Sequence, residues 1–194
     1  MIGKSIRHLR TVLLALLVAA GCAGRSSHVV FKNPEMDFGS IQTVAVLPFT
    51  NLTREAMATE RVRDVFMTML QATGGVYVIP PGEVARGLAR LNIERPTTLT
   101  AEEVVKFAKI ANADAVIAGT VSEYGEVRSG TTSANVVSVS LQMMEAQTGK
   151  VVWTASSTKG GVAMTDRLFG GGGEPMNRVT QKAVDDLLEK LFGK

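Results

Sequence analysis

The sequence predicts an α/β (α+β) domain with one mixed sheet of about five strands and helices packed against it. Three patterns lead to this class. The run TVAVLPF at 43–49 is almost entirely apolar, as in a strand buried on both faces. Apolar residues at helical spacing follow it, and the later run VSVSLQM at 137–143 alternates as a half-buried antiparallel strand does. The predicted order, β-α-β-α-α-β-β-β-α, is typical of a sheet covered by helices.

Residues 1–21 have the pattern of a cleaved signal peptide. Lys4, Arg7 and Arg10 precede an apolar run of roughly ten residues, which is too short to span a bilayer because a spanning helix needs about 20. Cys22, the only cysteine, follows the small residues AAG at 19–21, which resemble a bacterial lipobox. The resemblance implies cleavage before Cys22 and acylation of its thiol and its new amino group. The alternative is a buried structural cysteine.

An acylated Cys22 would hold the mature protein on a membrane. Each buried CH2 group contributes about 0.8 kcal/mol, so three acyl chains anchor stably where one binds reversibly. Ala23 after Cys22 implies the outer membrane, by similarity to the sorting rule of diderm bacteria. We interpret residues 22–39 as a tether because their composition is mixed and Asn33-Pro34 interrupts them. Fully extended, this tether reaches roughly 60 Å.

Charge and length limit the mature protein further. Removal of residues 1–21 takes away three basic and no acidic side chains, which leaves 18 Lys and Arg against 18 Asp and Glu. The net charge is then close to zero, so we expect no nucleic-acid partner. Residues 40–194 are enough for a single domain with its own core. One cysteine forms no intramolecular disulfide.

The first half of the domain should contain two parallel strands and three helices. After the strand at 43–49, apolar residues at helical spacing predict a helix from about 54 to 73, ended by Gly74-Gly75. A second strand follows at 76–79, and short connections make the two strands parallel neighbours. Val84, Leu88 and Leu91 mark a short helix. Thr100 and Glu103 form a capping box that begins another helix.

The second half should contain three strands and a last helix. The run ADAVIAGTVSEY at 113–124 suits a central strand, and the alternating strand from 137 is its partner. The turn QTGK at 147–150 joins that strand to another at 151–155 as a hairpin. A glycine-rich stretch, 160–173, precedes a helix after Pro175 whose apolar stripe is Val179, Ala183, Leu187 and Leu191.

Groups for catalysis or metal binding are sparse. The one mature histidine, His28, lies in the tether, and zinc needs three or four converging ligands. Nothing in their spacing selects a catalytic pair among the carboxylates, which are Asp114, Glu123, Glu126 and Asp166. The glycines at 170–173 lack the order of a phosphate-binding loop, so a linker is favoured. We therefore expect no enzymatic activity, no metal and no cofactor other than the covalent lipid on Cys22.

Three stretches resemble a group of bacterial envelope lipoproteins: VAVLPF at 44–49, NADAVIAGTVSEY at 112–124 and TGKVVW at 148–153. The group comprises curli-secretion lipoproteins, lipoprotein activators of penicillin-binding proteins and a little-characterised lipoprotein family of similar length. The resemblance covers about residues 42–192. It implies a domain like the amino-terminal domain of the Tol-Pal translocation protein, which acts through protein contacts.

The resulting functional prediction is a non-enzymatic lipoprotein at the periplasmic face of the outer membrane, an accessory in envelope assembly or export. Its partners would be the membrane, other envelope proteins and further copies of itself. Alternatives are a subunit of a curli-type secretion pore, an activator of a peptidoglycan synthase and, more distantly, a carboxylate-based hydrolase. Leu168 and Phe169, flanked by glycines, either pack on their own domain or contact a partner.

Overall fold

The computed structural model describes residues 30–130, 132–161 and 173–193. Within these ranges a seven-stranded mixed sheet has the order β1-β7-β6-β5-β2-β4, with β3 beside β5. The strands are β1 (Val30–Lys32), β2 (Thr43–Val46), β3 (Thr50–Asn51), β4 (Tyr77–Val78), β5 (Ala115–Ser129), β6 (Thr132–Glu145) and β7 (Val151–Gly160). The helices are α2 (Ala58–Ala72), α3 (Pro81–Arg90), α4 (Ala101–Ala111) and α6 (Met176–Phe192), with a 3-10 turn η1 (Phe38–Ser40).

The predicted class is confirmed, and so are its local pairings. β2 and β4 are parallel neighbours, β5 and β6 are antiparallel, and β6 and β7 form the predicted hairpin. The sheet is larger than expected, because β1 and β3 were not predicted and β5 and β6 extend to Ser129 and from Thr132. β5 also lies between β2 and β6, an arrangement that places residues about 70 positions apart side by side, such as Val44 and Ala115.

The last ten residues of the predicted tether belong to the domain instead. Val30–Lys32 pairs antiparallel with β7, and the Asn33 amide donates to the Val152 carbonyl at 2.8 Å. Without β1, the backbone groups on this edge of β7 would have no strand partner. This pairing explains why residues 30–33 are bound to the sheet. Met36 and Phe38 then pack against the core. Residues 30–39 are thus part of the described domain, while Cys22 and His28 lie outside the described residues.

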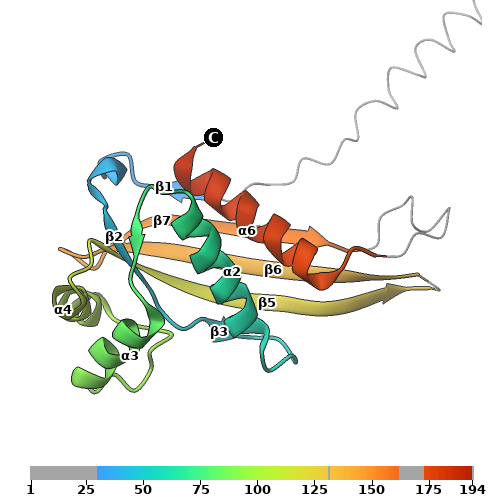
Figure 1. Ribbon diagram of the computed structural model, residues 1–194, viewed down its shortest axis with the longest axis horizontal. Coiled ribbons are helices and arrows are strands. Elements are labelled where there is room, and N and C mark those ends of the chain that lie inside the picture. Colours follow the sequence, from blue (N-terminus) through green and yellow to red (C-terminus); the bar gives the residue numbers. More distant parts are fainter. Residues whose placement is uncertain (1–29, 131, 162–172, 194) are drawn as a thin grey trace, which may run out of the picture.

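The core has two layers, one on each face of the sheet. Side chains alternate along β2, so that Val44 and Val46 face α2 and α6, while Ala45 and Leu47 face α3 and α4. Trp153 is fully buried in the larger layer. α2 and α6 lie side by side across the sheet and run in the same direction (Figure 1). Their carboxyl ends therefore meet at one end of the domain.

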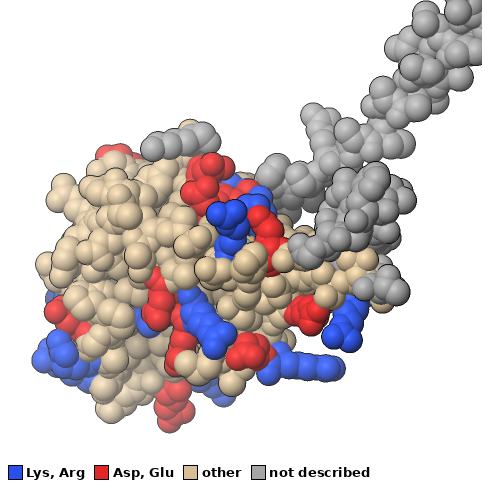
Figure 2. Space-filling view, turned by 45° about the vertical axis from the view of Figure 1, so that its right-hand side comes forward, with Lys and Arg blue, Asp and Glu red and all other residues tan. Residues whose placement is uncertain are grey.

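Charged side chains of both signs are interspersed on the face that Figure 2 shows, without a large block of one sign. This distribution agrees with the near-zero charge expected for the mature chain. A membrane-crossing helix would have to be longer and more apolar than any helix in the described part of the chain.

Candidate functional site between helices α2 and α6

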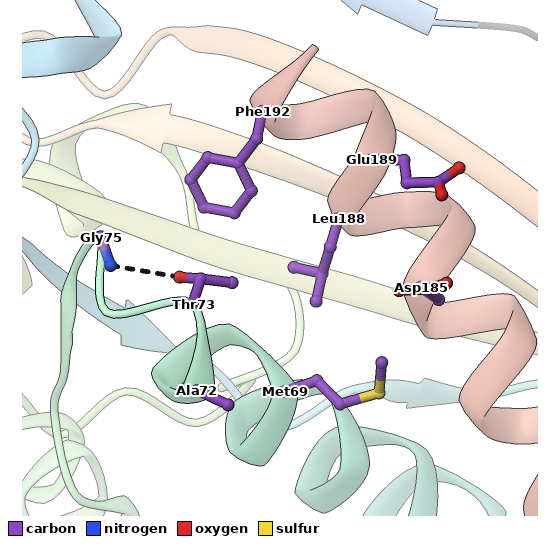
Figure 3. A pocket seen from close by; sticks show the side chains of 8 residues that line it. All are labelled: Met69, Ala72, Thr73, Gly75, Asp185, Leu188, Glu189 and Phe192. Carbon is purple, nitrogen blue, oxygen red and sulfur yellow. Dashed lines mark hydrogen bonds between the residues drawn. The ribbon is translucent and has the colours of Figure 1, made fainter. Parts of the chain in front are cut away.

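A groove lies between the carboxyl-terminal halves of α2 and α6 (Figure 3). Its volume is about 580 Å³. Four lining residues come from α2 and the turn after it, and four come from α6: Met69, Ala72, Thr73, Gly75, Asp185, Leu188, Glu189 and Phe192. Leu188 and Phe192 point toward α2 in Figure 3, so they form an apolar floor with Met69.

Helical spacing explains how the sequence builds this groove. Leu188 and Phe192 are four residues apart on α6 and share one stripe, and Asp185 and Glu189 share the next. Leu188 is buried, whereas Phe192 is 40% exposed. On the α2 side, the Thr73 hydroxyl donates to the Leu70 carbonyl at 2.7 Å and accepts from the Gly75 amide at 3.2 Å. These two bonds hold the turn that closes the groove.

The carboxyl end of the groove is lined by acidic side chains. The last carbonyls of a helix make its carboxyl end partially negative, and both α2 and α6 end here. Asp185 and Glu189 add two carboxylates, and the lining residues include no lysine or arginine. Lys190 does not compensate them, because its ammonium group turns to β7 and donates to the Ser156 carbonyl at 2.7 Å and to Asp186.

The other end of the groove has the opposite character. Past Met69 and Asp185 it continues into a hollow of about 420 Å³ beside the first half of α6. Arg178, Gln181 and Lys182 line this hollow. The Lys182 ammonium group lies 2.6 Å from the Glu174 carboxylate, which offsets its positive charge. The charge of Arg178 is therefore the less offset of the two positive charges in this hollow. The complete groove is therefore apolar at its floor, acidic at the carboxyl ends of the two helices and more basic beside the first half of α6.

Asp114 and Glu126, two of the carboxylates that the sequence offered for acid–base chemistry, have separate structural roles. The Asp114 carboxylate accepts from the backbone amides of Gln42 and Thr43 at 3.0 and 2.8 Å, so it fixes the start of β2. Glu126 forms an exposed ion pair with Arg128 at 3.8 Å. Asp166, Leu168 and Phe169 lie outside the described residues. Among the residues that the structure does describe, no group of three or more His, Cys, Asp or Glu could hold a metal.

Sequence reasoning missed this groove although a signal was present. The predicted stripe of α6, from Val179 to Leu191, is buried against the sheet as expected. Leu188 and Phe192 form a second apolar stripe beside it. A second stripe predicts a second packing partner or a partly uncovered surface, but only the position of α2 shows that this surface is a groove.

A small α/β sheet domain that follows a signal-like segment and Cys22 is typical of the globular domains of bacterial lipoproteins. The chain belongs to one such family, because the model described as "Putative lipoprotein GNA1162-like" matches residues 37–186. This match confirms the group of envelope lipoproteins that the sequence resembles. No curated protein matches the chain significantly.

Solved structures share the fold. The PelC dodecamer from Paraburkholderia phytofirmans is 20% identical, with a TM-score of 0.56 over 84% of this chain and 97% of that one. Lipoprotein GNA1162 from Neisseria meningitidis is 18% identical, with a TM-score of 0.57 over 79% of this chain and 99% of that one. These likenesses establish the architecture.

Proposed function

We propose that this chain is an accessory lipoprotein of the cell envelope, anchored through acylated Cys22 at the periplasmic face of the outer membrane. It acts through non-enzymatic protein contacts in envelope assembly or export. Membership of a lipoprotein family supports the anchor, together with the small residues before Cys22. The groove between α2 and α6 is the observation that carries the contact function.

The occupant that fits this groove is an amphipathic helix of a partner envelope protein, lying antiparallel to α2 and α6. Such a helix would place apolar residues at positions i, i+4 and i+7 over Met69, Leu188 and Phe192. Its partially positive amino end would meet Asp185 and Glu189, and its carboxyl end would lie near Arg178. The distance from Arg178 to Phe192 along α6 is about 21 Å at 1.5 Å per residue, which corresponds to roughly 14 residues of partner helix.

A peptide measurement tests this contact. The mature lipoprotein in nanodiscs would be titrated with a labelled 14-residue peptide that has leucines on one face and arginines in its first two turns. Replacing Asp185 and Glu189 together (D185N/E189Q) should weaken binding about 5- to 10-fold at low salt, because two charge contacts are lost. The matched control E123Q/E126Q removes two acidic groups from β5 and should leave binding unchanged. Equal weakening by the two double substitutions would show that the peptide does not bind in the groove.

The anchor is tested separately. Cells that make the Cys22→Ser variant would be labelled with a fatty-acid analogue and fractionated. We expect the variant to lose both the label and its sedimentation with outer membranes. Label that persists on the variant would show that the anchor is elsewhere.

Self-association is a second candidate, favoured by the free edge of β5. In the described part of the chain, residues 123–129 of β5 pair with β6 on one side, and no strand pairs with them on the other. An open strand edge can pair with another chain, and PelC of P. phytofirmans forms a dodecamer. Sedimentation velocity of the detergent-solubilised lipoprotein tests this, with Val127→Pro expected to lower the oligomeric mass by blocking edge pairing.

A further inference from the structure

The outermost strand of the sheet, β1, is unusually apolar for an edge. Val30 is 39% exposed and Phe31 is 50% exposed, and the third residue, Lys32, is exposed as well. Natural proteins generally protect exposed edge strands with charge or by covering them. Lys32 provides only partial protection, because its ammonium group turns inward, 4.6 Å above the Phe38 ring and 3.4 Å from the Leu191 carbonyl.

The position of β1 in the sequence limits what can cover it. Seven residues, 23–29, separate Val30 from Cys22. Eight steps of 3.3–3.6 Å span at most about 29 Å, whatever path they take. A domain of this size has a radius of gyration of roughly 15 Å, and hence a diameter near 40 Å. If Cys22 is acylated, as proposed above, β1 cannot lie on the side of the domain that faces away from the membrane.

The side chains of β1 suit the headgroup layer of a bilayer. Phe31 lies opposite Thr154 on the sheet face away from α6, while Val30 and Lys32 lie on the α6 face, so apolar groups flank the edge on both sides. Aromatic and aliphatic side chains bind at the boundary of headgroups and acyl chains, and nearby lysines keep their charge in water. No other described strand pairs with β1 on its side away from β7. Its backbone groups on that side would find water and lipid headgroups as hydrogen-bond partners there, which the hydrocarbon core would deny them.

We propose that β1 is the membrane-facing edge of the domain, with Val30 and Phe31 seated in the lipid headgroup layer. This contact sets the orientation of the domain relative to the membrane. β3 lies four strands from β1, about 19 Å across the sheet at 4.8 Å per strand, and so faces the periplasm. The inference rests on the proposed anchor at Cys22, but it adds a second contact that the anchor alone does not require.

Site-specific quenching tests the orientation. Acylation blocks the thiol of Cys22, so single cysteines introduced by Phe31→Cys, Val30→Cys and Leu52→Cys can be labelled with a fluorophore in the mature lipoprotein. Leu52 is the matched control, because it follows β3 and is 66% exposed. The labelled proteins would be reconstituted in vesicles of phosphatidylethanolamine and phosphatidylglycerol, with or without nitroxide-bearing headgroups.

We expect quenching at positions 30 and 31 to exceed that at position 52 at least threefold. Equal quenching at the three positions would overturn the orientation while leaving the anchor intact. Disulfide-linked dimers through position 31 without lipid quenching would overturn it too, because a second copy would then cover the edge. Protein that fails to float with the vesicles would refute the anchor at Cys22, and with it this inference.

Discussion

Replacing Gly149 by alanine should destabilise the domain far more than its position in a turn suggests. Gly149 joins β6 to β7 and has φ +67°. A Cβ atom there would overlap the carbonyl oxygen of Ala101 and lie 2.7 Å from its Cα, at the start of α4. Neither atom can move without displacing the helix backbone. The substitution therefore combines left-handed strain with a steric clash.

The two contributions can be separated with Gly74. Gly74 follows α2, has φ +68°, and has nothing within 4 Å of the position of an added Cβ. Gly74→Ala should thus cost only the left-handed strain, about 1 kcal/mol. Gly149→Ala adds an overpacking cost of about 2–3 kcal/mol because the backbone of α4 must shift. The expected losses correspond to a lower Tm of about 2–4 °C for Gly74→Ala and about 6–16 °C for Gly149→Ala.

Urea unfolding followed by the fluorescence of Trp153 measures this difference. Trp153 is the only tryptophan and is fully buried, so its emission reports on the core. Far-ultraviolet circular dichroism should give the same midpoint. Equal losses of stability for the two variants would show that the turn and α4 are not packed as closely as described.

Three further predictions concern other parts of the domain. Burial opposes ionisation of Asp186, but hydrogen bonds from Lys190 and Lys159 outweigh it and lower the Asp186 pKa to about 2. The stability from this group, about 1–2 kcal/mol after solvent screening, should be lost as pH falls from about 5 to 2, and D186N should flatten that part of a stability–pH curve. Thr100→Ala should lower the unfolding free energy by about 1 kcal/mol and Thr100→Ser should restore most of it, as measured by urea titration. Alanine at both Leu168 and Phe169 should cost about 2–5 kcal/mol each if they fill their own core; if they contact a partner, crosslinked complexes should disappear while Tm is unchanged.

Local sequence signals predicted the elements that local interactions determine. The capping box is one example: the Thr100 amide donates to the Glu103 carboxylate at 2.7 Å, and the Glu103 amide donates to the Thr100 hydroxyl at 3.3 Å. These bonds from Thr100 lower the Glu103 pKa. The turn at 147–150 is another, because the Gly149 amide donates to the Glu145 carbonyl at 2.9 Å within the predicted hairpin.

The strands that sequence reasoning missed depend on distant partners. β3 has two residues and β1 has three, which is too short for any periodicity to be visible. Thr50 pairs with Thr120, and Val30 pairs with Ala155, so their structure is decided by chain segments far away in the sequence. The groove escaped prediction for the same reason, since it requires both α6 and its neighbour α2.

Because β1 is so short, its detachment from β7 would lengthen the tether between Cys22 and the domain. Three residue pairs join β1 to β7, and the load from a membrane anchor would pull on this strand first. Peeling residues 30–40 from the domain would add eleven residues to the connection, or about 36–40 Å of reach. The pairing of β2 with β4 and β5 in the middle of the sheet would be untouched by this release. If Cys22 is acylated as proposed, the domain would have two distances from its membrane, a shorter one with β1 paired and a longer one reached when mechanical tension detaches β1.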